Sequence, residues 1–348
     1  MGKIILKGLK MLLKGIWYFF CISFVVGLIK SAFKRENDIS QFTTTSITRK
    51  QSKIILKELK EFPNGTQLAI GLIDENKTTF FGVKIEDDKP IEIDNKSNVF
   101  EVASITKVFT STLLANAVLD DKIKLSDTIN AFYDFSFKND EQVTFQDLAN
   151  HTSGLPRLPT NMNPKDRRNP YKDYSSTDFE TYFSSLLTLK NKGEMQYSNL
   201  GMALLGNTLE KVEKDSYENL LQRKIFSKYQ MQNSTSEISK VEGMLVKGFD
   251  KNGNETLNWE RDFFKGNGAV LSTVEDLTKF LKAQFYTTNK ELVLTRKETF
   301  NSDVNRSIGL GWHIKINSYG KQYWRNGATG GYRSYMICLL YTSDAADE

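Results

Sequence analysis

The sequence predicts an α+β protein in which an antiparallel sheet accompanies a mostly helical lobe. Runs rich in β-branched and aromatic residues occur at 67–85 and again after residue 309, with turn residues between them. The intervening stretch, about 121–255, has the apolar spacing of helices and loops. We therefore expect one sheet built from both ends of the chain and flanked by helices, with a cleft between the sheet and the helical lobe.

Each predicted helix or strand rests on the local spacing of apolar residues or on local β-branched and aromatic content. Before residue 120 the pattern predicts a helix at 51–62, a hairpin of strands 67–73 and 78–85, and a helix at 104–119. Within the lobe it predicts helices at 176–189, 200–213 and 216–229. Strand character is expected to return after Gly266, with strands at 309–316, 322–325 and 332–341.

The positive charge is confined to the N-terminus. The chain has 348 residues and a formal net charge of +5, from 47 basic and 42 acidic side chains. Residues 1–35 hold 7 of the basic side chains and no acidic one, so the remaining body has 40 basic and 42 acidic side chains. A body with no basic excess argues against a nucleic-acid partner.

The N-terminal leader, residues 1–35, is predicted to contain a membrane segment. Residues 15–29 form an uncharged, strongly apolar run between lysines. Residues 1–35 are expected to be an uncleaved membrane anchor, with secretion after signal cleavage as the alternative. Either places the body outside the cytoplasm, in the periplasm or at the cell surface. Residues 36–50 are expected to be a polar linker, and residues 51–341 the functional domain.

Cysteines and histidines are too few for a Cys/His zinc site. The two cysteines, Cys21 and Cys338, lie at opposite ends of the chain, so no disulfide framework is expected. The two histidines, His151 and His313, have no paired cysteines beside them. We expect no metal and no cofactor.

A Ser-x-x-Lys pattern supplies the candidate nucleophile. Ser104 begins a predicted helix and Lys107 follows one turn later on the same face. A buried lysine can lose its proton and accept one from the serine. The same pattern at Ser31 and Ser318 lies beside the leader and in a turn, and Ser104 could instead be only a helix N-cap.

Two further elements could complete a site. Tyr197 precedes a predicted helix, and Asn199 follows two residues later; a phenol can relay a proton and a carboxamide can bind a substrate amide. Arg325 could pair with a substrate carboxylate. The backbone N–H groups after Gly327, beginning with that of Ala328, could help to form an oxyanion hole. The alternatives are a second Tyr-x-Asn at Tyr217, and an ordinary glycine-rich hairpin carrying an exposed arginine.

The ordered set of Ser104–Lys107, Tyr197–Asn199 and Arg325–Ala328 resembles the serine β-lactamase and penicillin-binding-protein family. It is most similar to the class C β-lactamase-like serine hydrolases, which carry Tyr-x-Asn as the second element. The likeness extends over roughly residues 50–340. It implies the β-lactamase/DD-peptidase-like fold.

The resemblance also implies a role for each residue. Ser104 would be the acylated nucleophile, and Lys107 and Tyr197 would share the work of the general base. Asn199 would hold the substrate amide, and Arg325 would stand where the family has Lys or His. The backbone N–H groups of Ser104 and Ala328 would bind the oxyanion. His151 and His313 are expected to be structural.

Two departures from the family pattern matter. Arg325 cannot give up its proton, so a proton relay is lost at that position while carboxylate binding survives. The chain also ends soon after the last predicted strand, whereas the family continues with a further strand and helix. Residues 342–348 are therefore expected to be a tail foreign to the family on a domain truncated at its C-terminus, with a sheet edge left open.

The expected function is that of an exported serine hydrolase acting through a Ser104 acyl-enzyme. The substrate would be an amide or ester: a peptidoglycan-type peptide, a β-lactam or a small ester. The alternative is a penicillin-binding sensor or wall-binding domain that is non-catalytic or turns over once. The expected partners are that substrate and, through the leader, a membrane; the oligomeric state is left open.

Overall fold

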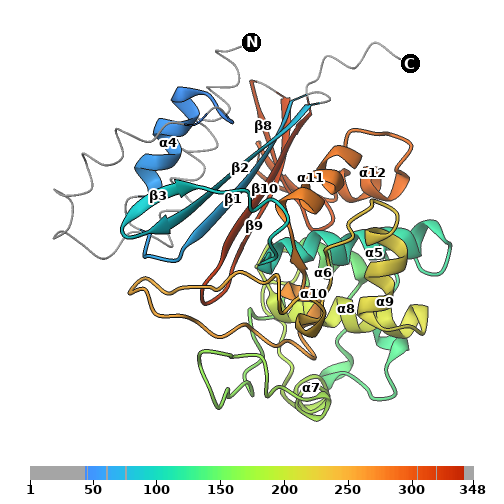
Figure 1. Cartoon of the computed structure of the whole chain (residues 1–348). Coiled ribbons are helices and arrows are strands. Elements are labelled where there is room, and N and C mark those ends of the chain that lie inside the picture. Colours follow the sequence, from blue (N-terminus) through green and yellow to red (C-terminus); the bar gives the residue numbers. More distant parts are fainter. Residues whose placement is uncertain are drawn as a thin grey trace. The chain divides into compact units, whose positions relative to one another are not determined.

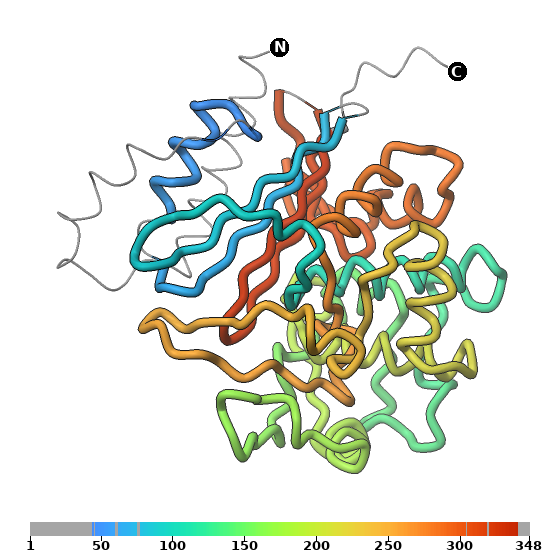
Figure 2. The backbone as a smooth tube through the Cα atoms, viewed as in Figure 1, coloured from blue at the N-terminus to red at the C-terminus, as the bar shows by residue number. Residues whose placement is uncertain are grey.

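The computed structural model describes residues 44, 46–59, 62–74, 77–303, 305–318 and 320–340 (Figures 1 and 2). The predicted leader, residues 36–43 and 45 of the predicted linker, and the predicted tail lie outside the described residues. Within the described part, no helix is both long and apolar enough to cross a bilayer. The contacts divide the chain into two compact units, 1–96 with 247–256, and 97–246 with 257–348.

The described residues of the first unit form a three-stranded antiparallel sheet and the helix α4 (Arg49–Leu59). Strands β1 (Gln67–Asp74) and β2 (Lys77–Glu86) form the predicted hairpin, with Gln67 opposite Lys84. The sheet continues with β3 (Lys89–Glu92), which the sequence pattern did not predict. Apolar residues of the helix and β2 pack in one cluster, which includes Leu56, Leu59, Phe81, Val83 and Ile85.

The second unit contains a five-stranded antiparallel sheet in the order β10-β9-β8-β7-β6. Its strands are β6 (Phe300–Asp303), β7 (Arg306–Ile308), β8 (His313–Asn317), β9 (Gly320–Ala328) and β10 (Arg333–Leu340). A separate short pair joins β4 (Phe100–Glu101) to β5 (Leu271–Ser272). The predicted strands 322–325 and 332–341 match β9 and β10, and 309–316 is strand only from His313.

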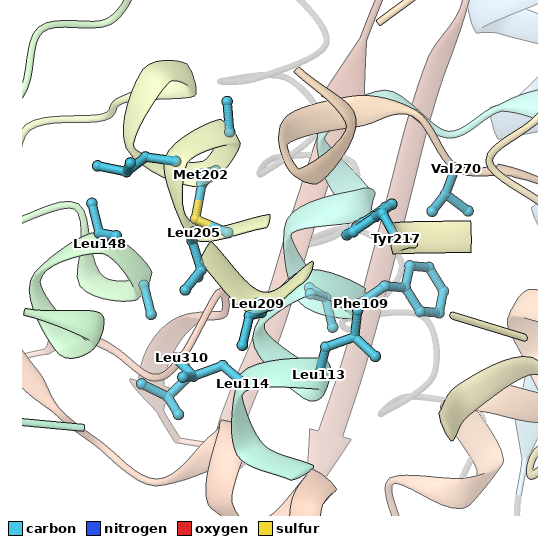
Figure 3. Packing of buried hydrophobic residues seen from close by; sticks show 14 of the residues in the cluster. Phe109, Leu113, Leu114, Leu148, Met202, Leu205, Leu209, Tyr217, Val270 and Leu310 are labelled. Carbon is cyan, nitrogen blue, oxygen red and sulfur yellow. The ribbon is translucent and has the colours of Figure 1, made fainter. Parts of the chain in front are cut away.

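The helices of the second unit surround one long, buried helix. That helix is α5 (Thr106–Leu119), and buried side chains cover nearly all of its sides. It packs against α8 (Asn199–Glu213) through Phe109, Leu113, Leu205 and their neighbours (Figure 3). The other helices and helical turns are α6 (Phe145–Asn150), α7 (Ser176–Thr181), η4 (Tyr182–Leu186), α9 (Tyr217–Leu221), η5 (Gln222–Phe226), α10 (Lys265–Gly268), α11 (Val274–Ala283), α12 (Lys290–Arg296), and the short turns η1 (Ala103–Ile105), η2 (Ile129–Phe132), η3 (Lys138–Asp140) and η6 (Ile238–Lys240).

The expectation that strand character returns after Gly266 holds only in part. Residues 265–296 hold three helices and the two-residue strand β5, and the five-stranded sheet begins at Phe300. The clearest is α11, which begins where the Thr273 side chain accepts a hydrogen bond from the backbone N–H of Asp276. Leu277, Phe280 and Leu281 then lie at helical spacing and pack on the core. The Thr273 N-cap favours a helix more strongly than the neighbouring β-branched residues favour a strand.

The α+β class is confirmed, with antiparallel sheets and a mostly helical middle of the chain. The strands from the two ends of the chain are each hydrogen bonded within their own sheet, β1–β3 in the first unit and β6–β10 in the second. Every predicted site residue belongs to the second unit, so the site can be built from that unit alone.

Candidate active site

Ser104 lies in a strained turn between a strand and a helix. The preceding residue, Ala103, has φ +48°, in the left-handed region that non-glycine residues rarely occupy. Ser104 is the middle residue of η1, and α5 begins two residues later at Thr106. The turn is held by the backbone N–H of Val102, which donates to Val270 O at 3.2 Å. Ser104 itself is half-buried, so part of the residue remains accessible to solvent.

Lys107 reaches back to this hydroxyl. Its Nζ donates to Ser104 Oγ at 3.0 Å and to the main-chain oxygen of Asn267 at 2.7 Å. The side chain is fully buried, and burial lowers the pKa of Lys107 to about 7, with Arg325 and Arg261 adding in the same direction. A lysine with this pKa can accept a proton near neutral pH.

Tyr197 contacts the other side of the same hydroxyl. Its phenol oxygen lies 2.8 Å from Ser104 Oγ. The neighbouring residues fix the loop: Gln196 N–H donates to His151 O at 2.7 Å, and Ser198 Oγ accepts from Gly201 N at 2.8 Å as the N-cap of α8. Burial raises the pKa of Tyr197, but the charges of Lys107 and Arg325 and the hydrogen bonds outweigh it and bring the pKa to about 7.

Asn199 is the first residue of α8 and is mostly buried. Its backbone N–H donates to Arg157 O at 3.0 Å, and its Nδ2 donates to the hydroxyl of Tyr171 at 3.2 Å. The carboxamide is therefore held beside Tyr197 with no hydrogen bond to its oxygen from a described residue. That oxygen can accept a hydrogen bond from a substrate amide.

Arg325 is buried rather than exposed, with 2% of its surface accessible. Its Nε donates to Ser104 O and its Nη1 to Gly311 O, both at 3.3 Å. The same guanidinium lies 3.3 Å from His313 Nε2 and 3.4 Å from His151 Nε2. No carboxylate among the described residues pairs with it, and burial lowers the pKa of Arg325.

Strand β9 passes directly against the Ser104 turn. A Cβ placed on Gly327 would lie 2.3 Å from Val102 O and 2.8 Å from Ser104 N. The adjacent strand supports this approach, because Ser334, opposite Gly327 in the register, donates from Oγ to Val102 O at 2.7 Å. Only glycine permits this separation, which sets the end of β9 at Ala328 close to the backbone N–H of Ser104.

Both histidines contact Arg325 and stay neutral. Burial and the Arg325 charge lower the pKa of His313 to about 3 and hold the pKa of His151 well below its usual range. His151 ends α6 with φ +61°, and its Nδ1 accepts from the backbone N–H of Ser198 at 3.3 Å. His313 stacks on Trp324, with ring centres 4.5 Å apart. Neither ring is hydrogen bonded to Ser104 in the described structure.

The alternative motifs do not form a second site. Tyr217 is buried in the core, where its hydroxyl lies 2.8 Å from Thr110 Oγ1. Lys321, the partner of Ser318 in the pattern, instead pairs with Glu298 at 2.8 Å. Ser31 lies outside the described residues. Within the described ranges no three His, Cys, Asp or Glu side chains group as a metal site would require.

Three residues beside the site were missed by sequence reasoning. Asn267 offers its backbone oxygen to Lys107 and its Oδ1 to Arg261 Nη1, at 2.6 Å. Arg261 packs over Tyr171, with its Cζ 4.5 Å from the ring centre. Arg157 lies over Tyr197, with its Cζ 5.2 Å from the ring centre. No motif spacing in the sequence marks these three residues, because they reach the site through main-chain atoms or from distant parts of the chain.

The fold and this geometry define a class: an α+β protein whose serine is hydrogen bonded to a buried lysine and to a tyrosine. Comparison of the chain with known proteins leads to the same class. The sequence profile described as Beta-lactamase matches residues 67–340. The chain belongs to the Beta-lactamase family, whose homologues are serine hydrolases of the β-lactamase and DD-peptidase type.

Individual relatives share low sequence identity with this chain. The chain is 30% identical over 213 residues to "Beta-lactamase-like protein 2" of Dictyostelium discoideum, a match that covers 56% of this chain and 37% of that protein. It is 23% identical over 266 residues to "D-alanyl-D-alanine-carboxypeptidase/endopeptidase AmpH" of Escherichia coli K12, covering 70% and 68%. The chain thus spans little more than a third of the first of these relatives.

A solved structure supports the fold. The crystal structure of a class C β-lactamase from Rhodobacter sphaeroides superposes with a TM-score of 0.66 at 18% identity, covering 82% of this chain and 88% of that one. The expected β-lactamase/DD-peptidase-like fold is confirmed.

Proposed function

We propose that this protein is a serine hydrolase that acts through an acyl-enzyme on Ser104. The observation that carries the proposal is the shared hydroxyl: Lys107 Nζ at 3.0 Å and the Tyr197 phenol oxygen at 2.8 Å both hydrogen bond to Ser104 Oγ. With the pKa of each at about 7, one of them can be unprotonated at neutral pH.

Acylation would proceed as follows. The unprotonated member of the Lys107–Tyr197 pair takes the Ser104 proton as Oγ attacks the substrate carbonyl. The oxyanion that forms is held by the backbone N–H groups of Ser104 and Ala328. When the tetrahedral intermediate collapses, the leaving amine or alcohol receives the proton from the pair. A water molecule, deprotonated by Tyr197, then attacks the ester carbonyl. The bond between the acyl carbon and Ser104 Oγ breaks, the proton passes from Tyr197 to Oγ, and the acid product leaves.

Asn199 would bind the amide of the acyl group, and the expected substrates are peptidoglycan-type peptides, β-lactams or small esters. The site supports the chemistry of acyl transfer and leaves the acyl group open. We further propose that the basic, apolar leader exports the body to the periplasm or cell surface, a prediction that cell fractionation tests.

The direct test is covalent labelling followed by intact-protein mass spectrometry. A panel of penicillins, depsipeptides and 4-nitrophenyl esters should add one acyl group to the wild-type protein. Ser104→Ala should abolish the adduct, and Ser318→Ala, the same change in the alternative motif, should retain it. Equal labelling of wild type and Ser104→Ala would contradict the proposal.

A second candidate is a penicillin-binding sensor or wall-binding domain without turnover. The burial of Arg325 favours it, because the family's third cationic position is then less available to substrate. A fluorescent penicillin distinguishes the two functions: a stable, stoichiometric label on Ser104 supports the sensor, whereas release of the label with continued consumption of penicillin supports the hydrolase.

A further inference from the structure

Arg157 is an exposed cation beside this site. Its guanidinium carbon lies 5.2 Å from the centre of the Tyr197 ring. The side chain is exposed, and no carboxylate in the described part of the chain forms an ion pair with it. An unpaired guanidinium in water beside a predicted catalytic tyrosine can bind a carboxylate in two-pronged geometry.

The main chain fixes where Arg157 stands. Its carbonyl oxygen accepts from the backbone N–H groups of Asn199 at 3.0 Å and Leu200 at 3.2 Å, the first N–H groups of α8. The residue before it, Pro156, accepts from Ser198 Oγ at 2.6 Å. Arg157 is thus tied to the same helix end as Asn199, which is the acyl-group side of the proposed site.

Arg325 differs from Arg157 both in its burial and in its contacts. Its guanidinium is buried and is already engaged by two main-chain oxygens and two histidines. A substrate anion would have to displace these contacts before it could bind Arg325. Arg157 requires no such exchange, so the two arginines have different uses.

We propose that Arg157 determines specificity by binding a carboxylate on the acyl part of the substrate. The inference rests on the proposed Ser104 chemistry and names its substrate class: acyl donors whose acyl chain ends in an acid. Matched probes are mono-4-nitrophenyl adipate and 4-nitrophenyl hexanoate, which have acyl chains of equal length and differ in the terminal carboxylate.

The readout is the ratio of kcat/KM for the adipate ester to that for the hexanoate ester. Arg157→Gln should lower this ratio by about 10-fold, since a charged hydrogen bond at a partly solvated site is lost. Arg157→Lys should lower it less, and Arg157→Glu should lower it most. Arg223→Gln makes the same charge change at an arginine paired with Asp215, and should leave the ratio within about 2-fold of wild type.

An unchanged ratio in Arg157→Gln would overturn the inference, and so would an equal loss for both esters, since that would mean Arg157 acts only through Tyr197. A second measurement separates this from failure of the Ser104 chemistry. In a Ser104→Ala background, monomethyl adipate should bind more tightly than methyl hexanoate, and Arg157→Gln should remove the difference. Absence of that preference overturns the inference even if Ser104 is shown to be acylated.

Discussion

The ammonium nitrogen of Lys107 lies 5.0 Å from the centre of the Tyr197 ring, and the two side chains hydrogen bond to one hydroxyl. Burial disfavours a charge on either group, yet each group stabilises the opposite charge on the other. The pair therefore behaves as a unit that loses one proton near neutral pH.

Acylation should follow that titration. Below pH 7 both members of the Lys107–Tyr197 pair are protonated and neither accepts the Ser104 proton, so the rate should rise with pH through about 7. The single-turnover rate should be about 10-fold lower at pH 6 than at pH 8. Stopped-flow acylation with a chromogenic ester measures it. A rate that is flat over this interval, or one that falls with pH, would show that the pair is not the base.

Lys107 should reduce stability at acid and neutral pH. Its pKa is 10.5 in the unfolded chain and about 7 when folded, so below pH 7 folding buries a charge. Between pH 7 and 10.5 the unfolded chain binds more protons, and stability rises with pH. Lys107→Met should therefore raise the unfolding free energy at pH 6 by about 1–3 kcal/mol, with lost hydrogen bonds offsetting part of the gain. Urea denaturation at pH 6 and pH 9 checks it: the gain should shrink at pH 9, and a loss of stability at pH 6 would contradict it.

Arg325 should set the pH range of the reaction. Its charge lowers the pKa of both Lys107 and Tyr197, so Arg325→Met should move the midpoint of the acylation profile upward by about 1 pH unit. Arg325→Lys keeps a cation and should shift it less. If Arg325 instead binds substrate carboxylate directly, Arg325→Met should raise KM for anionic substrates and leave the midpoint in place.

The sequence was most informative where chemistry and local pattern coincide. Ser104 and Lys107 are one turn apart at the start of a predicted helix, so their contact follows from spacing and helix position together; the same spacing at Ser318 and Lys321 gives no such pair. The contact with Tyr197 joins residues far apart in the chain, and only the resemblance to a family brought them together before the structure was known. The burial of Arg325 could not be inferred, since the Gly311 and Ser104 oxygens that hold it come from parts of the chain about 200 residues apart.

The helices and strands, too, could be predicted where a local sequence pattern marks them. The hairpin of β1 and β2 was predicted because turn residues separate two alternating strands. Short edge strands such as β3 and β6 were missed because four residues carry little pattern. The start of α11 carries both signals in the sequence, the N-cap Thr273 for a helix and β-branched residues for a strand, and the cap prevails in the structure.

His151 should prove to be structural. It has φ +61°, its Nδ1 accepts the Ser198 N–H, and no bond links it to Ser104. Asparagine tolerates this backbone conformation and offers an acceptor oxygen, so His151→Asn should destabilise the fold by only about 1 kcal/mol and slow acylation less than about 10-fold. Thermal unfolding and acylation rates test this. A fall of about 1,000-fold without unfolding would make His151 a participant in the chemistry.

Gly327 tests whether the backbone of β9 takes part in the reaction. A methyl group there would meet Val102 O at 2.3 Å and Ser104 N at 2.8 Å, so Gly327→Ala must push the strand away from the serine turn. Separating the N–H groups of Ser104 and Ala328 should slow acylation by about 100-fold or more, at a loss of about 1–3 kcal/mol in stability. Gly243→Ala is the matched control, because a Cβ at Gly243 has nothing within 4 Å. Burst acylation and thermal unfolding of both variants separate the effects. If Gly327→Ala remains folded and acylates at the wild-type rate, the oxyanion is not held between Ser104 and Ala328, and the proposed geometry of the reaction is wrong at that point.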